Sequence, residues 1–314
     1  MGKTGVVFPG QGSQFVGMGG DLCAGDATFR GVFERACDIL GEDILSLCLS
    51  GPQERLDRTV NTQIAVVVFE IAAYEAIRRR IPLEPAVMAG HSLGEYSAIY
   101  AAGGLDLEGV LTLVRSRARH HEEAVPQGVG AMAAVVGLTL EQVNALALVC
   151  SRDGEPADVA NINAPNQAVV SGHARAVERL MERARGIGAR LVVRLPISAP
   201  CHSRLLAHAA ERFRKDLGKA VFRPFQRPVV PNCDPGVLYD EGNAAELLAR
   251  QIVSPVRWQE TIERMARMGV DTILEIGPKK VLSGLVKNIR KEMRSVFAGD
   301  APSIGRCGEL FRPA

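Results

Sequence analysis

The sequence lacks the cysteine pattern of a disulfide framework or of a zinc site. Its seven cysteines are odd in number, widely scattered along 314 residues and free of any C-x-x-C pair. Structural zinc sites and disulfide-rich domains both depend on closely spaced cysteines. We therefore expect the cysteines to be mostly small core residues, and we expect neither a metal nor a bound cofactor.

A large excess of charge is also missing. The 37 lysine and arginine side chains nearly balance the 35 aspartate and glutamate side chains, which leaves a formal net charge of +2. A field of one sign over the whole surface is what draws a protein to nucleic acid or to an anionic membrane. We expect neither partner, and any charged substrate must be recognised locally.

Long apolar runs are not evident near the start of the chain. A single lysine is followed only by the short run Val6–Pro9, which is too short for a signal-peptide core, and no later window suggests a membrane span. These absences predict a cytoplasmic protein. With 47% hydrophobic and 23% charged residues, the chain can form one large globular domain, or a large and a small one.

The glycine-rich segment Gly10–Gln14 lacks the residues of a nucleotide-binding loop. It follows the apolar stretch Gly5–Phe8, but it has neither the Gly-Lys-Ser/Thr of a P-loop nor a G-x-G-x-x-G pattern. Glycines at alternate positions let the backbone approach a ligand, and they also form ordinary turns between a strand and a helix. Both interpretations stay open at this point.

The most informative segment that is present is Gly90–Gly94, which reads Gly-His-Ser-Leu-Gly. The apolar stretch Ala86–Ala89 predicts a strand before it, and Glu95–Ala102 predicts a helix after it. Such a bend places the serine on a sharp turn with its hydroxyl exposed, and it needs neighbours without side chains. Ser92 is therefore the candidate nucleophile, and an ordinary turn with an idle serine is the alternative.

Alternating strands and helices predict an α/β fold with a parallel, α/β-hydrolase-like sheet covered on both faces. The composition changes near Pro126–Gly130, and the following elements have the β-α-β-β-α-β order of a ferredoxin-like unit. We predict a catalytic domain of residues 1–127 and 197–314 and an inserted ferredoxin-like domain of residues 128–196. A last long helix is expected over Val281–Arg294, and residues 297–314 are left unassigned.

A serine nucleophile needs a base within hydrogen-bond reach. Among the six histidines, His202 stands out because a loop fixed by prolines, Pro196–Cys201, leads into it from the end of a strand. The others lie in the elbow, where the side chain should point away from Ser92, or on expected helices or at a helix start, where a solvated or capping role is typical. These are His91, His120, His121, His173 and His208.

Several segments together resemble the malonyl-CoA:acyl carrier protein transacylases, the acyltransferase family of fatty acid synthesis. The matching segments follow the family's order and span roughly residues 4–290. They are residues 8–14, 90–96, 130–134, 161–165, 200–202, 251–258 and 275–278.

The resemblance implies a role for each matching residue. Ser92 matches the nucleophile that forms the acyl ester, and His202 matches its base. Gln251 matches the residue whose main-chain carbonyl orients the imidazole in place of a buried carboxylate. Gln11 and the Leu93 N–H match the donors of the oxyanion hole.

Arg117 matches the arginine that binds malonate in this family. A transferred group that ends in a carboxylate also needs a fixed cation, and a guanidinium binds a carboxylate through two parallel hydrogen bonds. Only one or two of the three alternating arginines can face the site, so Arg115 and Arg119 are expected to be solvated. The remaining substrate-binding candidates are Gln63, Asn163, His91 and Met132.

The implied reaction moves a malonyl group from malonyl-CoA to the phosphopantetheine thiol of acyl carrier protein, and we expect the enzyme to be a monomer. Because such carriers are typically acidic, the basic residues within Lys279–Arg294 and Arg78–Arg80 are candidate docking surfaces.

Three alternatives remain. They are a transferase of a polyketide or malonate-decarboxylase system, a serine esterase with no use for Arg117, and a non-catalytic scaffold. Cys201 replaces a common serine, and we expect it to be a small pocket-wall residue rather than an activated thiol.

Overall fold

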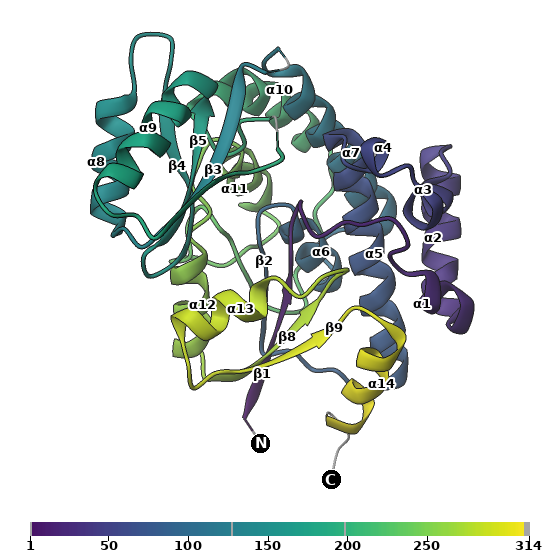
Figure 1. The fold of residues 1–314 in the computed structure, drawn as a ribbon. Coiled ribbons are helices and arrows are strands. Elements are labelled where there is room, and N and C mark those ends of the chain that lie inside the picture. Colours follow the sequence, from purple (N-terminus) through teal and green to yellow (C-terminus); the bar gives the residue numbers. More distant parts are fainter. Residues whose placement is uncertain (1, 127, 198, 311–314) are drawn as a thin grey trace.

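A five-stranded parallel sheet forms the centre of the larger unit (Figure 1). The computed structural model describes residues 2–126, 128–197 and 199–310. The strand order is β7-β2-β1-β8-β9, and every neighbouring pair is parallel. The strands are β1 (Lys3–Phe8), β2 (Val87–Gly90), β7 (Val229–Val230), β8 (Val270–Ile276) and β9 (Arg294–Ala298).

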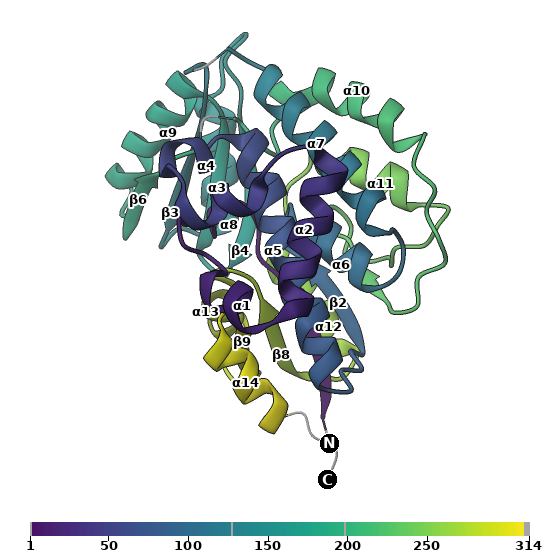
Figure 2. The same cartoon turned by 90° about the vertical axis from the view of Figure 1, so that its right-hand side faces the viewer.

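Helices cover both faces of this sheet, as its uninterrupted apolar strands require. Val6 and Phe8 of β1 point into one core, whereas Val7 between them points into a second core on the other face. Helices α2 (Ala27–Leu40), α5 (Thr59–Arg80) and α7 (Leu107–Glu123) contact one another on the first side (Figure 2). Helices α12 (Trp258–Arg267) and α13 (Leu282–Ile289) pack against the sheet in the second core.

The helices of the larger unit are α1 (Gly20–Gly25), α2 (Ala27–Leu40), α3 (Ile44–Ser50), α4 (Gln53–Leu56), α5 (Thr59–Arg80), α6 (Gly94–Ala101), α7 (Leu107–Glu123), α10 (Ala207–Leu217), α11 (Ala244–Gln251), α12 (Trp258–Arg267), α13 (Leu282–Ile289) and α14 (Ala301–Leu310). A 3₁₀ turn, η1 (Arg204–Leu206), precedes α10.

A second, antiparallel sheet with the strand order β4-β5-β3-β6 forms the smaller unit. Its elements are β3 (Gly130–Val136), α8 (Leu140–Cys150), β4 (Ala157–Ala164), β5 (Gln167–His173), α9 (Ala174–Gly186) and β6 (Leu191–Arg194). This is the β-α-β-β-α-β order expected from the sequence. The unit has a hydrophobic core of its own between the sheet and the two helices, which supports our proposal that residues 128–196 are an inserted domain.

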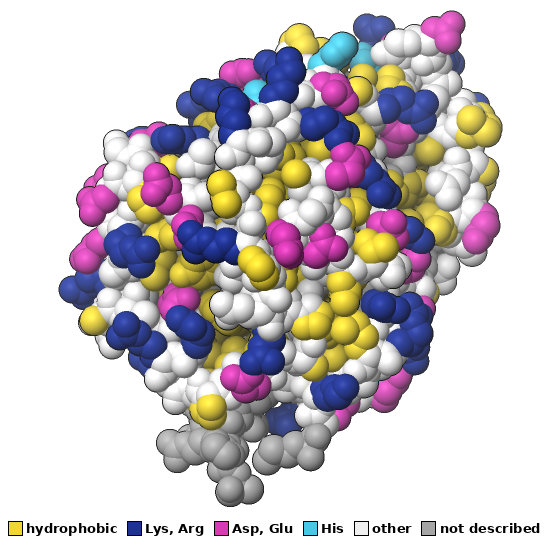
Figure 3. All heavy atoms as spheres, turned by 180° about the vertical axis from the view of Figure 1, so that it is seen from behind, with side chains coloured by type: hydrophobic (Ala, Val, Ile, Leu, Met, Phe, Trp, Pro, Cys, Tyr) yellow, Lys and Arg dark blue, Asp and Glu magenta, His cyan; other side chains and the backbone are white. Residues whose placement is uncertain are grey.

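The end of the chain corrects one expectation. The helix predicted over Val281–Arg294 ends at Ile289, because Arg290 adopts an extended conformation and Arg294 begins β9, which pairs with β8. The basic residues expected on one helix are therefore divided among a loop, a helix and a strand. On the face shown in Figure 3, basic and acidic side chains are interspersed.

Helix α5 corrects a second expectation, that no segment has the character of a membrane span. By length and composition α5 is apolar enough to cross a membrane, and 83% of its apolar window is buried inside the fold. Its partners include α2, α6 and α7. The hydrophobicity of α5 is thus that of a central core helix, with apolar residues around its whole circumference.

Candidate active site

Ser92 lies on the predicted elbow between β2 and α6. Its φ of 53° is in the left-handed region, which residues with a side chain seldom adopt. A Cβ on Gly90 would lie 1.8 Å from the carbonyl carbon of Gly94, and a Cβ on Gly94 would lie 2.2 Å from the carbonyl oxygen of Phe8. Both glycines are sterically required, and the elbow geometry expected from the sequence is confirmed.

The hydroxyl of Ser92 meets His202. Ser92 Oγ lies 2.7 Å from His202 Nε2, while His202 Nδ1 lies 2.8 Å from the carbonyl oxygen of Gln251 and 3.1 Å from that of Ser254. Carbonyl oxygens only accept, so the ring proton is on Nδ1 and Nε2 is free to accept the serine proton. Burial and the positive charge of Arg117 lower the pKa of His202 to about 3, which keeps the imidazole neutral as a base requires.

Arg117 extends from α7 into the same site with only 2% of its surface exposed. Its guanidinium donates to Gln63 Oε1 at 2.7 Å, to Gln251 Oε1 at 3.2 Å and to Ser92 Oγ at 3.2 Å. Within the part of the chain that the structure describes, no carboxylate forms a salt bridge with Arg117. A buried cation without a counter-ion is costly, and an anionic ligand would relieve that cost.

The other arginines of α7 behave as expected from their helical positions. Arg115 and Arg119 are exposed, whereas Arg117 is buried between them.

His91 points away from the nucleophile, as its place in the elbow suggests. Its Nε2 lies 2.9 Å from Asn163 Oδ1, and its ring meets the Trp258 ring edge-on with centroids 5.4 Å apart. This pair therefore brings β4 of the smaller unit against the elbow.

Met132 and Cys201 belong to a small apolar cluster where the smaller unit meets the loop before His202. Cys201 Sγ lies 3.6 Å from His121 Nδ1, and burial raises the pKa of the thiol. A raised pKa disfavours the thiolate. The geometry thus agrees with a pocket-wall role for Cys201.

The glycine-rich turn after β1 lies against the elbow. The His91 N–H donates to the carbonyl oxygen of Phe8 at 2.9 Å, and a Cβ on Gly10 would lie 2.6 Å from the carbonyl oxygen of His91. Gln11 and Leu93 thus lie on two adjoining turns beside Ser92. Their role as oxyanion donors stays a prediction.

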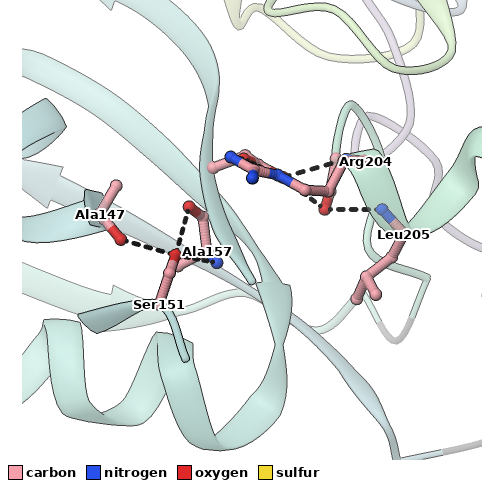
Figure 4. A network of polar contacts seen from close by, with 7 residues as sticks. Ala147, Ser151, Ala157, Arg204 and Leu205 are labelled. Carbon is pink, nitrogen blue, oxygen red and sulfur yellow. Dashed lines mark hydrogen bonds and ion pairs between the residues drawn. The ribbon is translucent and has the colours of Figure 1, made fainter. Parts of the chain in front are cut away.

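The residues after His202 are fixed to the smaller unit. Asp158 of β4 accepts hydrogen bonds from Ser203 Oγ at 2.9 Å and from the Arg204 N–H at 3.0 Å, and it forms an ion pair with the Arg204 guanidinium at 2.6 Å. Figure 4 shows Arg204 beside the strand that begins at Ala157, whose N–H donates to Ser151. The two units therefore meet directly next to the candidate base.

Comparisons with known proteins agree with this geometry. Residues 6–309 match the acyl transferase domain family. A malonyl CoA-acyl carrier protein transacylase of Bacillus subtilis is 38% identical over 97% of this chain and 96% of its own length, and one of Escherichia coli K12 is 40% identical over 90% and 91%. The chain belongs to the malonyl CoA-acyl carrier protein transacylase family.

Solved structures of this transacylase family have the same fold. An acyl carrier protein S-malonyltransferase of Vibrio cholerae superimposes with a TM-score of 0.93 at 39% identity, covering 97% of this chain and 99% of that one. A malonyl-transacylase described in complex with a type II polyketide acyl-carrier protein gives a TM-score of 0.96 at 36% identity, covering 98% and 99%. Membership of the transacylase family makes this chain an acyltransferase.

Sequence reasoning missed three buried groups around this transacylase site. The Asn232 side chain accepts from the Ser92 N–H at 2.6 Å and donates to the Gly90 carbonyl at 2.7 Å, which clamps the elbow. The other two groups are Glu95, which accepts from the Asn232 N–H, and Tyr239, whose hydroxyl donates to Glu95 at 3.1 Å. One signal was available for Asn232, because it follows β7 at the carboxyl edge of the parallel sheet, where α/β proteins place functional side chains.

Proposed function

We propose that this transacylase transfers a malonyl group from malonyl-CoA to the phosphopantetheine thiol of acyl carrier protein through an ester on Ser92. The observation that carries the proposal is the buried Arg117 guanidinium, which lies 3.2 Å from the Ser92 hydroxyl without a carboxylate partner among the described residues. A malonyl group on Ser92 would place its terminal carboxylate within reach of this cation. A neutral acyl group would leave the cation unpaired.

The first half-reaction forms the ester. His202 Nε2 accepts the Ser92 proton while the serine oxygen attacks the thioester carbonyl. Gln11 and the Leu93 N–H are the proposed donors to the oxyanion. When the carbon–sulfur bond breaks, the imidazolium returns its proton to the coenzyme A sulfur.

The second half-reaction reverses these roles. The carrier thiol gives its proton to His202 Nε2 and attacks the seryl ester, and the proton then returns to Ser92 as the ester bond breaks. Gln251 holds the imidazole through its main-chain carbonyl throughout both steps. The carboxylate on Arg117 also occupies space that a hydrolytic water would need.

Two further statements belong to this proposal. We propose a monomer, because the proposed groups around Ser92 come from one chain. We also propose a cytoplasmic location, since all seven cysteines are free thiols, as is usual in a reducing compartment.

Intact-mass analysis tests the proposed function. The protein is mixed separately with malonyl-CoA, acetyl-CoA and methylmalonyl-CoA, with Ser92→Ala as the matched control. We expect a malonyl adduct that requires Ser92 and is lost when acyl carrier protein is added. Rapid release of coenzyme A without an adduct would instead support an esterase. The absence of both an adduct and coenzyme A release would refute catalysis by these residues.

A role in polyketide synthesis is the second candidate. It is favoured by the likeness to a malonyl-transacylase in complex with a type II polyketide carrier. The chemistry is identical, so discharge of the malonyl ester by fatty acid carriers and by polyketide carriers must be compared directly.

A further inference from the structure

Gln251 contacts three of the proposed catalytic groups at once. It is fully buried at the end of α11. Its main-chain oxygen accepts from His202 Nδ1 at 2.8 Å, its side-chain Oε1 accepts from Arg117 at 3.2 Å, and its side-chain Nε2 donates to the Ser92 carbonyl at 2.9 Å. The orientation of this one amide therefore affects both the base and the cation.

Glu95 and the Ser92 carbonyl both accept from the NH₂ of that amide and together determine which way it faces. The carboxyl group lies in the first turn of α6 with 0% exposure, and it accepts hydrogen bonds from Gln251 Nε2, from the Asn232 N–H and from the Tyr239 hydroxyl. A glutamine amide turns its NH₂ to acceptors and its oxygen to donors. With its NH₂ held by Glu95, Gln251 must present its oxygen to Arg117; the reverse orientation would set two donors against each other.

We propose that Glu95 is a positioning residue for malonyl transfer, acting through the Gln251 amide on Arg117. This inference rests on the proposed function. It accounts for a buried carboxyl group that the proposed reaction does not use. It also explains how Arg117 keeps one orientation when it has no acidic partner of its own among the described residues.

Opposing effects act on the pKa of the Glu95 carboxyl group. Burial raises the pKa of Glu95, whereas the hydrogen bonds that it accepts from Asn232, Gln251 and Tyr239 and the charge of Arg117 stabilise the carboxylate. Replacing Glu95 by glutamine keeps the size of the side chain but adds an NH₂ that must face one of these donors. Glu95→Gln is therefore the sharpest substitution for testing the inference.

The experiment measures kcat/KM for acylation of the whole protein by malonyl-CoA and by acetyl-CoA. In Glu95→Gln we expect the malonyl-to-acetyl ratio to fall about tenfold or more, with a raised KM for malonyl-CoA, because Arg117 loses its orientation. The ratio does not depend on the fraction of folded protein. In an Arg117→Ala background, Glu95→Gln should leave the ratio unchanged.

Tyr239→Phe is the matched control, because it removes one donor from Glu95 without touching Gln251, and its ratio should stay near wild type. If kcat/KM for malonyl-CoA and for acetyl-CoA fell equally in Glu95→Gln, their ratio would be unchanged. That result would overturn the inference and show that Glu95 has only a structural role. If Glu95→Gln does not fold, Glu95→Asp decides: an intermediate ratio supports the inference and a wild-type ratio overturns it. Failure of the wild-type protein to form a malonyl ester would refute the proposed function itself, which is a distinct outcome.

Discussion

At the scale of single residues, the candidate site includes two residues whose backbone conformation is unusual. Ser92 and His202 have φ values of 53° and 59°, and both lie in the left-handed region. Such residues cost on the order of 1–3 kcal/mol each and persist only where their surroundings hold them. Asn232 and the elbow glycines hold Ser92, and the carbonyl oxygens of Gln251 and Ser254 hold the His202 ring.

The buried imidazole leads to a prediction about pH. Because burial and Arg117 lower the pKa of His202 to about 3, the base stays neutral well below the ordinary histidine pKa of about 6.5. We expect kcat/KM for acylation by malonyl-CoA to be flat from about pH 5 to about pH 7. Stopped-flow or rapid-quench measurement of the Ser92 ester checks this, and an inflection near the ordinary value would contradict it.

The same lowered pKa affects stability in a defined direction. Between about pH 6.5 and about pH 3 the unfolded chain binds a proton at His202 that the folded chain does not. This histidine therefore lowers the stability of the fold as the pH falls through that interval, and it has no such effect above it.

The sequence indicated the proposed reacting side chains more directly than the groups that support them. Ser92 was predictable because the steric demands of its turn are met only by flanking glycines, and His202 because prolines lead into it. Asn232 and Tyr239 are supports whose partners lie more than a hundred residues away. Only the packing of the sheet brings such pairs together, so local pattern and spacing could not reveal them.

At the scale of elements, the turn that follows His202 is attached to a strand of the other unit. Asp158 on β4 receives hydrogen bonds from both Ser203 and Arg204. The ring of His202 is thus held by the carbonyl at the end of α11, and the two residues that follow it are held by β4. Small movements between the units would change the distance between Ser92 and its base.

Replacing Asp158 by alanine tests this attachment. We expect acylation by malonyl-CoA to slow by about tenfold, because the turn that carries His202 loses the hydrogen bonds that Ser203 and Arg204 donate to Asp158. The loss of stability should be about 1–3 kcal/mol, because Asp158 is only 16% exposed and the buried Ser203 hydroxyl loses its acceptor. The control is Glu178→Ala, which breaks the half-exposed pair with Arg194 elsewhere on the smaller unit; equal rates in the two variants would contradict the prediction.

The bounds of an element could be predicted from the sequence where its apolar residues recur at a regular spacing, and could not be predicted where they do not. α7 is such an element, since Asp106 caps its start and its buried residues repeat at helical spacing. The strand after Ile289 was not predictable, because β9 is partly exposed and pairs with β8, which comes from earlier in the chain. Short helices such as α3 and α4 hold too few turns for a period to show.

At the scale of the whole molecule, the fold conceals nearly all of its thiols. Six of the seven cysteines are buried, and only Cys37 is half-buried. This distribution follows from two units that each enclose a core, with the sheet of the larger unit covered on both faces.

Thiol labelling checks this arrangement. In native buffer we expect one thiol per chain to react quickly with a disulfide reagent. The Cys37→Ala variant should lack this fast reaction. In denaturant all seven cysteines should react. Peptide mapping that found rapid native labelling of Cys48 or Cys233 would be incompatible with their raised pKa and burial.

The buried helix α5 also has a consequence for synthesis of the protein. Among its partners, α2 precedes it in the chain, whereas α7, β8 and α14 follow it. On a ribosome, α5 therefore emerges after α2 but before α6 and α7, which complete most of its cover. A nascent chain halted before α7 would display an apolar helix long enough to cross a membrane without its main later partner, so synthesis, rather than the finished fold, is the stage at which the apolar surface of α5 is exposed.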